Sequence, residues 1–310
     1  MHPPSRLAWL LRALCALQLA ALAAWLAWRW PGHPVQAVAG ALVIAGIAPL
    51  VLAVEFGLLA LVARHTPGEP GPRAGQLARA WLTESLDLYR VFYWRLAWRW
   101  REPVDHLEPA CAGQTGVVLV HGFVANRGIW APWMRRLRAE GRAFVAVNLE
   151  PVFASIDDYA PIIDRAVDQV AACTRRPPVL LCHSMGGLAA RAWLRASGGH
   201  DRVAHVITLG TPHGGTWLGR FASTLNGRQM RLHNVWLQQL AQDEEGQPQP
   251  PWTCWYGTCD NIVFPVTTAI RVKADNRRAE GLPHVALALD AGVMDACMET
   301  ISASSPSVSR

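Results

Sequence analysis

Ser184 stands where a side chain could act as an exposed nucleophile. The residues before it, Val179 to Cys182, form a short apolar run typical of a buried strand, and a helical composition begins at Gly187. A sharp strand-to-helix turn needs small residues beside the serine, because the helix backbone passes close to the strand. The pattern is Gly-x-Ser-x-Gly with Cys182 in place of the first glycine. We predict a nucleophilic Ser184; the alternative is a Ser-x-Gly turn without chemistry.

A second motif is an apolar strand that ends in His121-Gly122 just before a helix. Attack on an ester carbonyl places negative charge on its oxygen, and two preorganised backbone N–H groups are needed to hold that charge. We predict that the amides of Phe123 and Met185 supply them, with Val124 in place of Phe123 if the loop register differs by one residue. For His121 we expect a hydrogen bond that supports the loop.

Together the motifs of this chain resemble the bacterial lipase and esterase branch of the α/β-hydrolase family. The resemblance covers roughly Gly116 to the end of the chain and implies an α/β fold, a mostly parallel sheet flanked by helices. It also implies a catalytic triad in the chain order serine, acid, histidine. The motifs are His121-Gly122-Phe123, His183-Ser184-Met185-Gly186-Gly187 and Leu209-Gly210-Thr211-Pro212-His213-Gly214-Gly215-Thr216.

Asp260 is the predicted acid of this triad. It follows a predicted strand, and the run from Asp260 to Pro265 is similar to the family's strand-end aspartate followed by valine and proline. Its role would be to orient the imidazole and stabilise the charged form. The alternative is an exposed turn aspartate that caps the next segment. Asp290 and Glu280 fit less well, because neither follows a predicted strand and is itself followed by valine and proline.

His284 is the predicted base. Gly281-Leu282-Pro283-His284 is similar to the family's Gly-x-x-His before an apolar helix start, and no later histidine follows in the chain. For His205, His213 and His233 we expect packing or solvated roles, because the first lies on a predicted strand, the second precedes the acid and the third lies in a predicted cap.

The elements that must position these residues alternate between strand and helix from Gly116 onwards, which predicts a parallel sheet. Residues 111–310 would form the catalytic domain. Residues 214–251 leave this rhythm and are interpreted as a small cap over an acyl pocket, or as a plain helical connection. The predicted strands are 117–120, 143–148, 179–182, 203–209, 252–256 and 269–272, and the predicted helices are 130–140, 157–174 and 187–196.

Residues 1–65 are a different kind of sequence. Leu7 to Trp28 and Val35 to Ala63 are almost wholly apolar, and each is long enough to cross a bilayer. We predict a hairpin of two transmembrane helices; the alternative for the first run is a cleaved signal peptide. Arginines flanking the runs favour both ends in the cytoplasm, which would place the catalytic domain on the cytoplasmic side of a bacterial inner membrane. An interfacial belt is indicated by Trp25, Trp28 and Trp30.

Residues 66–110 join the two parts. Thr66 to Gly75 is rich in proline and glycine and is interpreted as a linker. Gln76 to Arg101 interleaves aromatic and aliphatic residues with arginines at helical spacing, which predicts an amphipathic helix. Two interpretations stay open: the helix lies at a bilayer surface, or it packs on the catalytic domain.

The composition argues against several classes of protein. The net charge of +6 comes almost wholly from arginine, with Lys273 the sole lysine, and no basic block suggests a nucleic-acid partner. The 7 cysteines are an odd number in a chain large enough to build its own core, so a disulfide scaffold is not expected. For Cys254 and Cys259 we expect packing roles, with a bridge as the alternative. Neither a metal-site spacing nor a phosphate-binding loop is present, so no cofactor is expected.

These observations predict a membrane-anchored carboxylic ester hydrolase acting on lipid-like acyl esters. Ser184 would attack the acyl carbonyl, an acyl-enzyme would form, and water activated by His284 would release the acid. The same residues would serve an acyltransferase or a thioesterase. Two other classes remain open, a catalytically silent membrane-anchored scaffold and a transporter with a soluble appendage. The sequence does not indicate an oligomeric state.

Overall fold

A six-stranded parallel sheet forms the centre of the catalytic domain. The computed structural model describes residues 5–66 and 71–304, so residues 67–70 of the predicted linker lie outside the described residues. Neighbouring strands follow the order β2-β1-β3-β4-β5-β6, and every pair is parallel. The strands are β1 (Val117–Val120), β2 (Phe144–Ala146), β3 (Val179–His183), β4 (His205–Leu209), β5 (Trp252–Gly257) and β6 (Asp275–Ala279).

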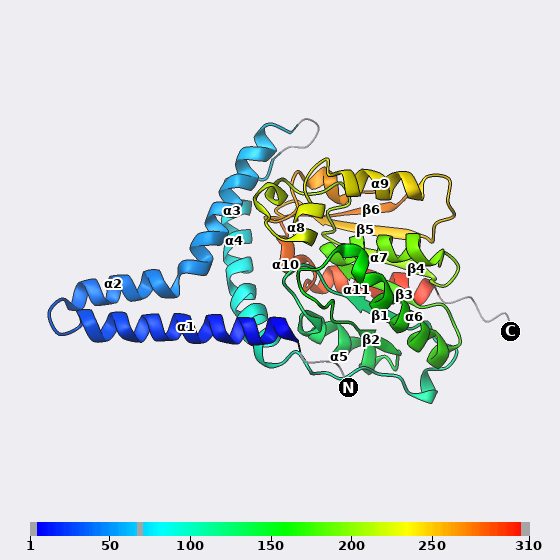
Figure 1. Cartoon of the computed structure of the whole chain (residues 1–310), viewed down its shortest axis with the longest axis horizontal. Helices are drawn as coiled ribbons and strands as arrows, with labels where there is room; N and C mark the ends of the chain where they lie inside the picture. The colour runs from blue at the N-terminus through cyan, green and yellow to red at the C-terminus, as the bar shows by residue number, and fades with distance from the viewer. Residues whose placement is uncertain (1–4, 67–70, 305–310) are drawn as a thin grey trace.

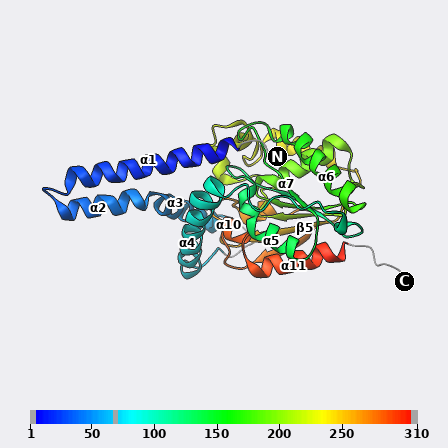
Figure 2. The same ribbon diagram turned by 90° about the horizontal axis from the view of Figure 1, so that it is seen from below.

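Helices cover both faces of this sheet, which explains why the central strands are apolar throughout. Figure 2 shows α6 and α7 on one face and α5 and α11 on the other. Two apolar clusters, one on each face, form the core. These helices are α5 (Ala131–Ala139), α6 (Ala160–Thr174), α7 (Met185–Ser197) and α11 (Ala291–Ala303). Short helical turns are η2 (Pro109–Cys111), η3 (Arg127–Trp130), η4 (Ile156–Tyr159) and η6 (Val266–Ala269).

The order of the strands places a topological switch point between β1 and β3. From β1 the chain passes outwards to β2, then crosses back to β3 on the other side of β1. Loops at the carboxyl ends of such neighbouring strands diverge, and ligands of open α/β sheets bind in the crevice between them. His121-Gly122 follows β1 and Ser184 follows β3, so both predicted motifs lie at this crevice.

The predicted strand over residues 269–272 is wrong. Residue 269 ends the helical turn η6, and the last strand is β6, whose sequence Asp-Asn-Arg-Arg-Ala is polar. β6 is the edge strand and pairs with β5 alone. An edge strand has one neighbour and a solvated side, so it does not need the apolar run that reveals a central strand.

The apolar N-terminus forms an arm that projects from the catalytic domain (Figure 1). α1 (Arg6–Arg29) and α3 (Ile47–Arg64) are long and apolar enough to cross a membrane by length and composition. The predicted second helix, Val35 to Ala63, is divided at Gly46 into α2 (Pro34–Ala45) and α3. α1 and α2 run side by side, whereas α3 turns away from them and lies along α4 (Figure 1).

Pro49 accounts for the bend between α2 and α3. A proline within a helix lacks the N–H that would bond the carbonyl four residues earlier, and its ring clashes with that carbonyl. Here that carbonyl is Ala45 O, and it accepts a hydrogen bond of 2.8 Å from the Tyr89 hydroxyl instead. The Pro49 carbonyl accepts from Trp81 Nε1, also at 2.8 Å. The bend is therefore fixed by two side chains from the segment after the linker.

That segment packs on the catalytic domain with its polar side inwards. α4 (Ala74–Leu88) continues directly into the π-helical η1 (Tyr89–Leu96). Glu84, Ser85 and Asp87 are buried, whereas Leu82 and Leu86 are 55% and 49% exposed. The predicted amphipathic helix therefore exists and packs on the domain, but its apolar residues are only partly used for that packing.

The region predicted as a cap or a helical connection contacts both α7 and the loop after β2. On α9, Glu244 forms two hydrogen bonds with Arg191 of α7, at 2.7 and 2.9 Å, as a crossover helix would. On α8, Asn226 Nδ2 donates to the Val152 carbonyl after β2, at 2.9 Å. The part before α9 thus contacts the loop after β2. The helices of this region are η5 (Trp217–Phe221), α8 (Leu225–Gln229) and α9 (Val235–Glu244).

Candidate active site

Ser184 sits on a strained turn between β3 and α7. Its φ of 55° and ψ of −130° lie in a region that non-glycine residues rarely adopt. Its N–H donates to the Leu209 carbonyl at 2.9 Å, and its carbonyl accepts from Thr211 Oγ1 at 2.8 Å. The backbone of Ser184 is therefore fixed on both sides. Its hydroxyl makes no hydrogen bond with a described residue.

Two glycines allow the close approach that this turn requires. A methyl group at Gly186 would lie 2.4 Å from the Val120 carbonyl oxygen, and one at Gly122 would lie 2.6 Å from Ser184 Cβ. Cys182, which replaces the first glycine of the pattern, lies within β3 and is fully buried under α7. The departure from the pattern is thus accommodated without altering the turn.

The contact at Gly122 leads to a prediction about stability. In Gly122→Ala the new methyl group must displace Ser184 or the His183 carbonyl oxygen, 3.0 Å away. We expect a loss of about 1–3 kcal/mol in the free energy of unfolding, as for other overpacked sites, measured as a lower melting temperature of the full chain in detergent. The matched control is Gly75→Ala, where a methyl group would meet no atom within 4 Å. Equal melting temperatures for the two variants would contradict the close approach.

Asp260 and His284 form a buried pair. The two residues are 2% and 5% exposed, and His284 Nδ1 lies 2.9 Å from Asp260 Oδ2. The other carboxylate oxygen of Asp260 accepts from the N–H groups of Ile262 and Val263, at 2.9 and 2.7 Å. Because a carboxylate can only accept, Nδ1 of His284 carries the proton and leaves Nε2 as the free, basic nitrogen.

His284 lies beside the serine turn. Its ring centroid is 4.7 Å from that of His183, the residue before Ser184. His183 Nε2 donates to the His284 carbonyl at 3.1 Å. Burial lowers the pKa of His183 well below its ordinary value, with a further lowering by the charge of His284. A neutral His183 therefore links the strand that carries the serine to the loop that carries the imidazole, and the sequence motifs did not assign it this position.

The charge state of His284 is set by acidic neighbours. Burial on its own lowers the pKa of His284, but the charge and the hydrogen bond of Asp260 outweigh it, with additions from Glu84 and Glu55. The pKa of His284 is therefore raised above its ordinary value. The protonated imidazole is stabilised at this place, as a base that must take up a proton during a reaction requires.

The loop after β1 is held in place by the side chain of His121. His121 Nδ1 donates to the Gly122 carbonyl at 2.9 Å, and its Nε2 accepts from the Leu149 N–H at 2.9 Å. Burial lowers the pKa of His121 to about 4, so the ring stays neutral and supports the loop. Among the described residues, the N–H groups of Phe123 and Met185 have no acceptor. Both are thus available to a ligand.

Two carboxylates from the N-terminal helices reach the loop of His284, which includes the short helix α10 (His284–Leu287), and sequence reasoning did not find them. Glu84 of α4 is 2% exposed and accepts from the N–H groups of Val285 and Ala286, at 2.8 and 3.2 Å. Glu55 of α3 accepts from Asn261 Nδ2 at 2.8 Å. Each of these contacts spans some two hundred positions in the sequence, which no local pattern reveals.

The comparisons with known proteins identify the family of the chain. The family model described as "Alpha/beta hydrolase family" matches residues 117–293, more than half of the chain. The chain belongs to the α/β-hydrolase family. No curated protein sequence matches this hydrolase. The resemblance noted from its motifs is confirmed at the level of the family, and the predicted parallel sheet flanked by helices is confirmed as its fold.

Solved structures similar to the hydrolase include bacterial lipases. The mature form of lipase BlEst2 from Bacillus licheniformis is 16% identical, with a TM-score of 0.56, and the match covers 65% of this chain and 96% of that chain. The propeptide form of the same lipase has the same identity and TM-score, with 65% and 52% covered. A monoacylglycerol lipase from Paleococcus ferrophilus is 16% identical, with a TM-score of 0.46 and 62% and 97% covered. At these identities the likeness concerns the fold.

Of the three other histidines considered from the sequence, His213 is buried, His205 is half-buried and His233 is exposed. His205 Nε2 lies 2.9 Å from Thr253 Oγ1 on the neighbouring strand. His213 is buried, and its Nε2 lies 3.2 Å from Thr208 Oγ1. His233 follows α8 in the cap region, with a positive φ of 57°. Cys254 and Cys259 are both buried free cysteines.

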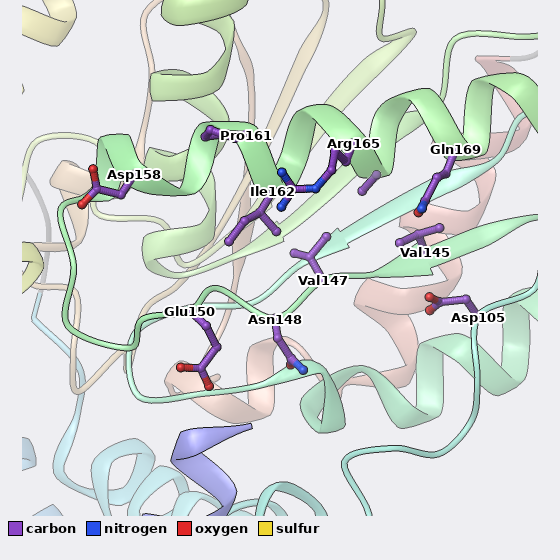
Figure 3. Close-up of a pocket in the computed structure, with 11 residues that line it drawn as sticks. Asp105, Val145, Val147, Asn148, Glu150, Asp158, Pro161, Ile162, Arg165 and Gln169 are labelled. Atoms are coloured by element: carbon purple, nitrogen blue, oxygen red, sulfur yellow. The ribbon is translucent and has the colours of Figure 1, made fainter. Parts of the chain in front are cut away.

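A cavity of 560 Å³ lies at the edge of the sheet beside β2 (Figure 3). It is bounded by β2 and α6, and its polar lining includes Asp105, Asn148, Glu150 and Arg165 (Figure 3). Ser184 and the Asp260–His284 pair do not line it. The cavity therefore lacks a nucleophile and stands apart from the switch point where the candidate site is built.

Proposed function

We propose that the hydrolase cleaves carboxylic esters through an acyl-enzyme, with Ser184 as nucleophile, His284 as general base and Asp260 as the acid that orients it. One observation carries the proposal: a free hydroxyl on a strained turn lies beside a buried His–Asp pair. The exposed fractions of Ser184 and His284 are 6% and 5%. A substrate would therefore reach the two side chains by a narrow route. Ser184 follows β3 at the carboxyl edge of the sheet, Asp260 follows β5 and His284 follows β6.

The proposed reaction uses His284 twice. Nε2 of His284 accepts the Ser184 proton as Oγ attacks the acyl carbonyl carbon, then donates it to the leaving alcohol as the ester C–O bond breaks. A water molecule then attacks the acyl-enzyme, loses its proton to Nε2, and Ser184 Oγ leaves with that proton. The short contact between Oγ and Nε2 would form as substrate binds, as is common for catalytic hydrogen bonds.

The oxyanion of each tetrahedral intermediate would be held by the amides of Phe123 and Met185. The Met185 amide begins α7, where the helix dipole adds positive potential. Val124, the next residue, has a positive φ of 49°, which marks a sharp turn in the loop. Donors fixed in this way before the reaction need no reorganisation when the charge forms.

An apolar hollow beside this loop supports a lipid-like acyl chain as substrate. A cavity of 540 Å³ is lined by Leu7 and Leu10 of α1 and by Val152 and Phe153 of the loop after β2. The Phe153 ring lies 5.9 Å from the Phe123 ring, so the cavity adjoins the proposed oxyanion loop. Fatty acyl chains bind in hollows of this chemistry, and the first turn of the N-terminal arm forms one wall.

The arm supports a membrane location. α1 has a mean hydropathy of 1.8, and only 11% of its apolar window is buried. α2 has 12 residues and is about 18 Å long. It is therefore too short to cross the hydrocarbon core of a bilayer, which is about 30 Å thick. The exposed leucines of α4, Leu82 and Leu86, favour contact with the lipid surface. We infer a hydrolase held at a membrane by its N-terminal helices, with the catalytic domain beside the bilayer.

The proposal is tested by covalent labelling of the full chain in detergent. A fluorophosphonate probe phosphonylates an activated serine, and peptide mass spectrometry should find the adduct on Ser184 in the wild type and no adduct in Ser184→Ala. The labelled protein should also lose turnover of p-nitrophenyl esters, with longer acyl chains preferred before labelling. Equal labelling of both proteins, or an adduct at another serine, would overturn the proposal.

A further inference from the structure

The loop that carries His284 is held from outside the catalytic domain. Glu84 of α4 receives two successive backbone N–H groups of this loop, one on each carboxylate oxygen, from Val285 and Ala286. The side chain is 2% exposed. A carboxylate at this position fixes the loop directly after His284 and therefore fixes the height of the imidazole above the sheet.

A second connection runs from α3 through Asn261. Glu55 accepts from Asn261 Nδ2 at 2.8 Å, and Asn261 Oδ1 accepts from the His284 N–H at 3.4 Å. Asn261 is fully buried and directly follows Asp260. The glutamate of the apolar helix α3 thus orients an amide that contacts the backbone of His284.

The two glutamates lie where their charge acts on the reaction. Burial raises the pKa of Glu84 to about 7, although the two N–H groups and the charge of His284 lower it. A buried carboxylate is costly unless something compensates it. When Ser184 transfers its proton to His284 Nε2, the imidazole becomes a cation, and the deprotonated form of Glu84, which predominates above about pH 7, then stabilises it. A neutral packing residue would not supply this stabilisation.

We propose that the N-terminal helices complete the active site, with Glu84 of α4 and Glu55 of α3 as positioning residues for the loop of His284. This inference rests on the proposed role of His284 as base. The helices that favour membrane contact are then also the helices that hold the base, so α3 and α4 must be docked on the catalytic domain for turnover.

The test measures kcat/KM for a p-nitrophenyl ester against pH, with the full chain in detergent. Glu84→Gln keeps the size of the side chain but turns an amide N–H₂ towards one of the two backbone N–H groups, so we expect the plateau to fall about tenfold or more. Loss of the negative charge should also lower the pKa of His284. The acidic limb of the profile should therefore move to lower pH.

Glu55→Gln should act in the same direction with a smaller effect, because it reaches His284 through Asn261. The matched control is Asp87→Asn, which removes another buried carboxylate of α4 whose partner is Arg90, at 3.6 Å. Asp87→Asn should leave both the plateau and the acidic limb unchanged. The charged groups that face His284 are Asp260, Glu84 and Glu55, with neutral His183 on its other side, and only the glutamates are altered.

A plateau that falls in Glu84→Gln while the acidic limb stays in place would reduce Glu84 to a structural residue and overturn the proposal, as would an unchanged profile. If Glu84→Gln does not fold, the acidic limb of Glu55→Gln decides in the same way. The proposed function is judged separately by Ser184→Ala. If that variant is active, the triad fails; if it is inactive and neither glutamine variant moves the limb, only the role of the N-terminal helices fails.

Discussion

Replacing Ser184 by alanine should lower kcat for an ester substrate by about 10⁶-fold, because the proposed covalent route has no other hydroxyl on the turn between β3 and α7. The residual rate would come from binding and from the oxyanion donors, which alanine leaves in place. The backbone of the turn should persist, since its hydrogen bonds to Leu209 and Thr211 use main-chain atoms of residue 184. The measurement is single-turnover and steady-state hydrolysis of a p-nitrophenyl ester.

The control for this variant is Ser197→Ala at the other end of α7. Ser197 Oγ donates to the Trp193 carbonyl at 2.8 Å, within the same helix. Its loss should cost about 1 kcal/mol of stability and leave kcat unchanged. If Ser184→Ala kept more than about a hundredth of the wild-type rate after removal of host esterases, the nucleophile would have to be sought elsewhere.

The sequence reveals the central strands because their burial on both faces demands apolar residues. β1 was predicted with its observed bounds, and β3 with one residue fewer. β6 was missed for the opposite reason, because an edge strand can be polar. Its Arg277 lies 5.6 Å from the centroid of the Trp255 ring on β5, a packing contact that no alternation pattern reports.

The candidate site divides in a similar way. Ser184, Asp260 and His284 each belong to a local motif, so the sequence could name all three as candidates. His183, Glu84 and Glu55 contact the same loop without a motif of their own. The first was read only as part of the serine motif, and the glutamates reach the site by tertiary packing across more than two hundred positions.

The N-terminal arm shows that an apolar composition can predict helix correctly and still miss a bend in it. Pro49 lies inside a continuous apolar run, and composition alone predicts one long helix there. The bend at Gly46 becomes stable because Tyr89 and Trp81 bond the carbonyls of Ala45 and Pro49. Those donors lie beyond the linker, so only the folded chain brings them to the bend.

Replacing Asp260 by asparagine should lower kcat/KM near neutral pH by about 10⁴-fold. Two backbone N–H groups point at Asp260 Oδ1, so the amide oxygen of asparagine would take that place and its N–H₂ would face His284 Nδ1. Nδ1 must then accept, which moves the imidazole proton to Nε2. A protonated Nε2 cannot take the proton of Ser184, so the hydroxyl stays unactivated.

The comparison that decides the acid is Asp290→Asn, because Asp290 is the other aspartate considered for this role. Its Oδ1 accepts from the Val293 N–H at 3.0 Å as the N-cap of α11. An asparagine is also a good N-cap, so Asp290→Asn should keep both its melting temperature and its kcat/KM. Since the charge of Asp260 raises the pKa of His284, the residual activity of Asp260→Asn should extend to lower pH than that of the wild type. An active Asp260→Asn together with an inactive Asp290→Asn would assign the acid to the second position.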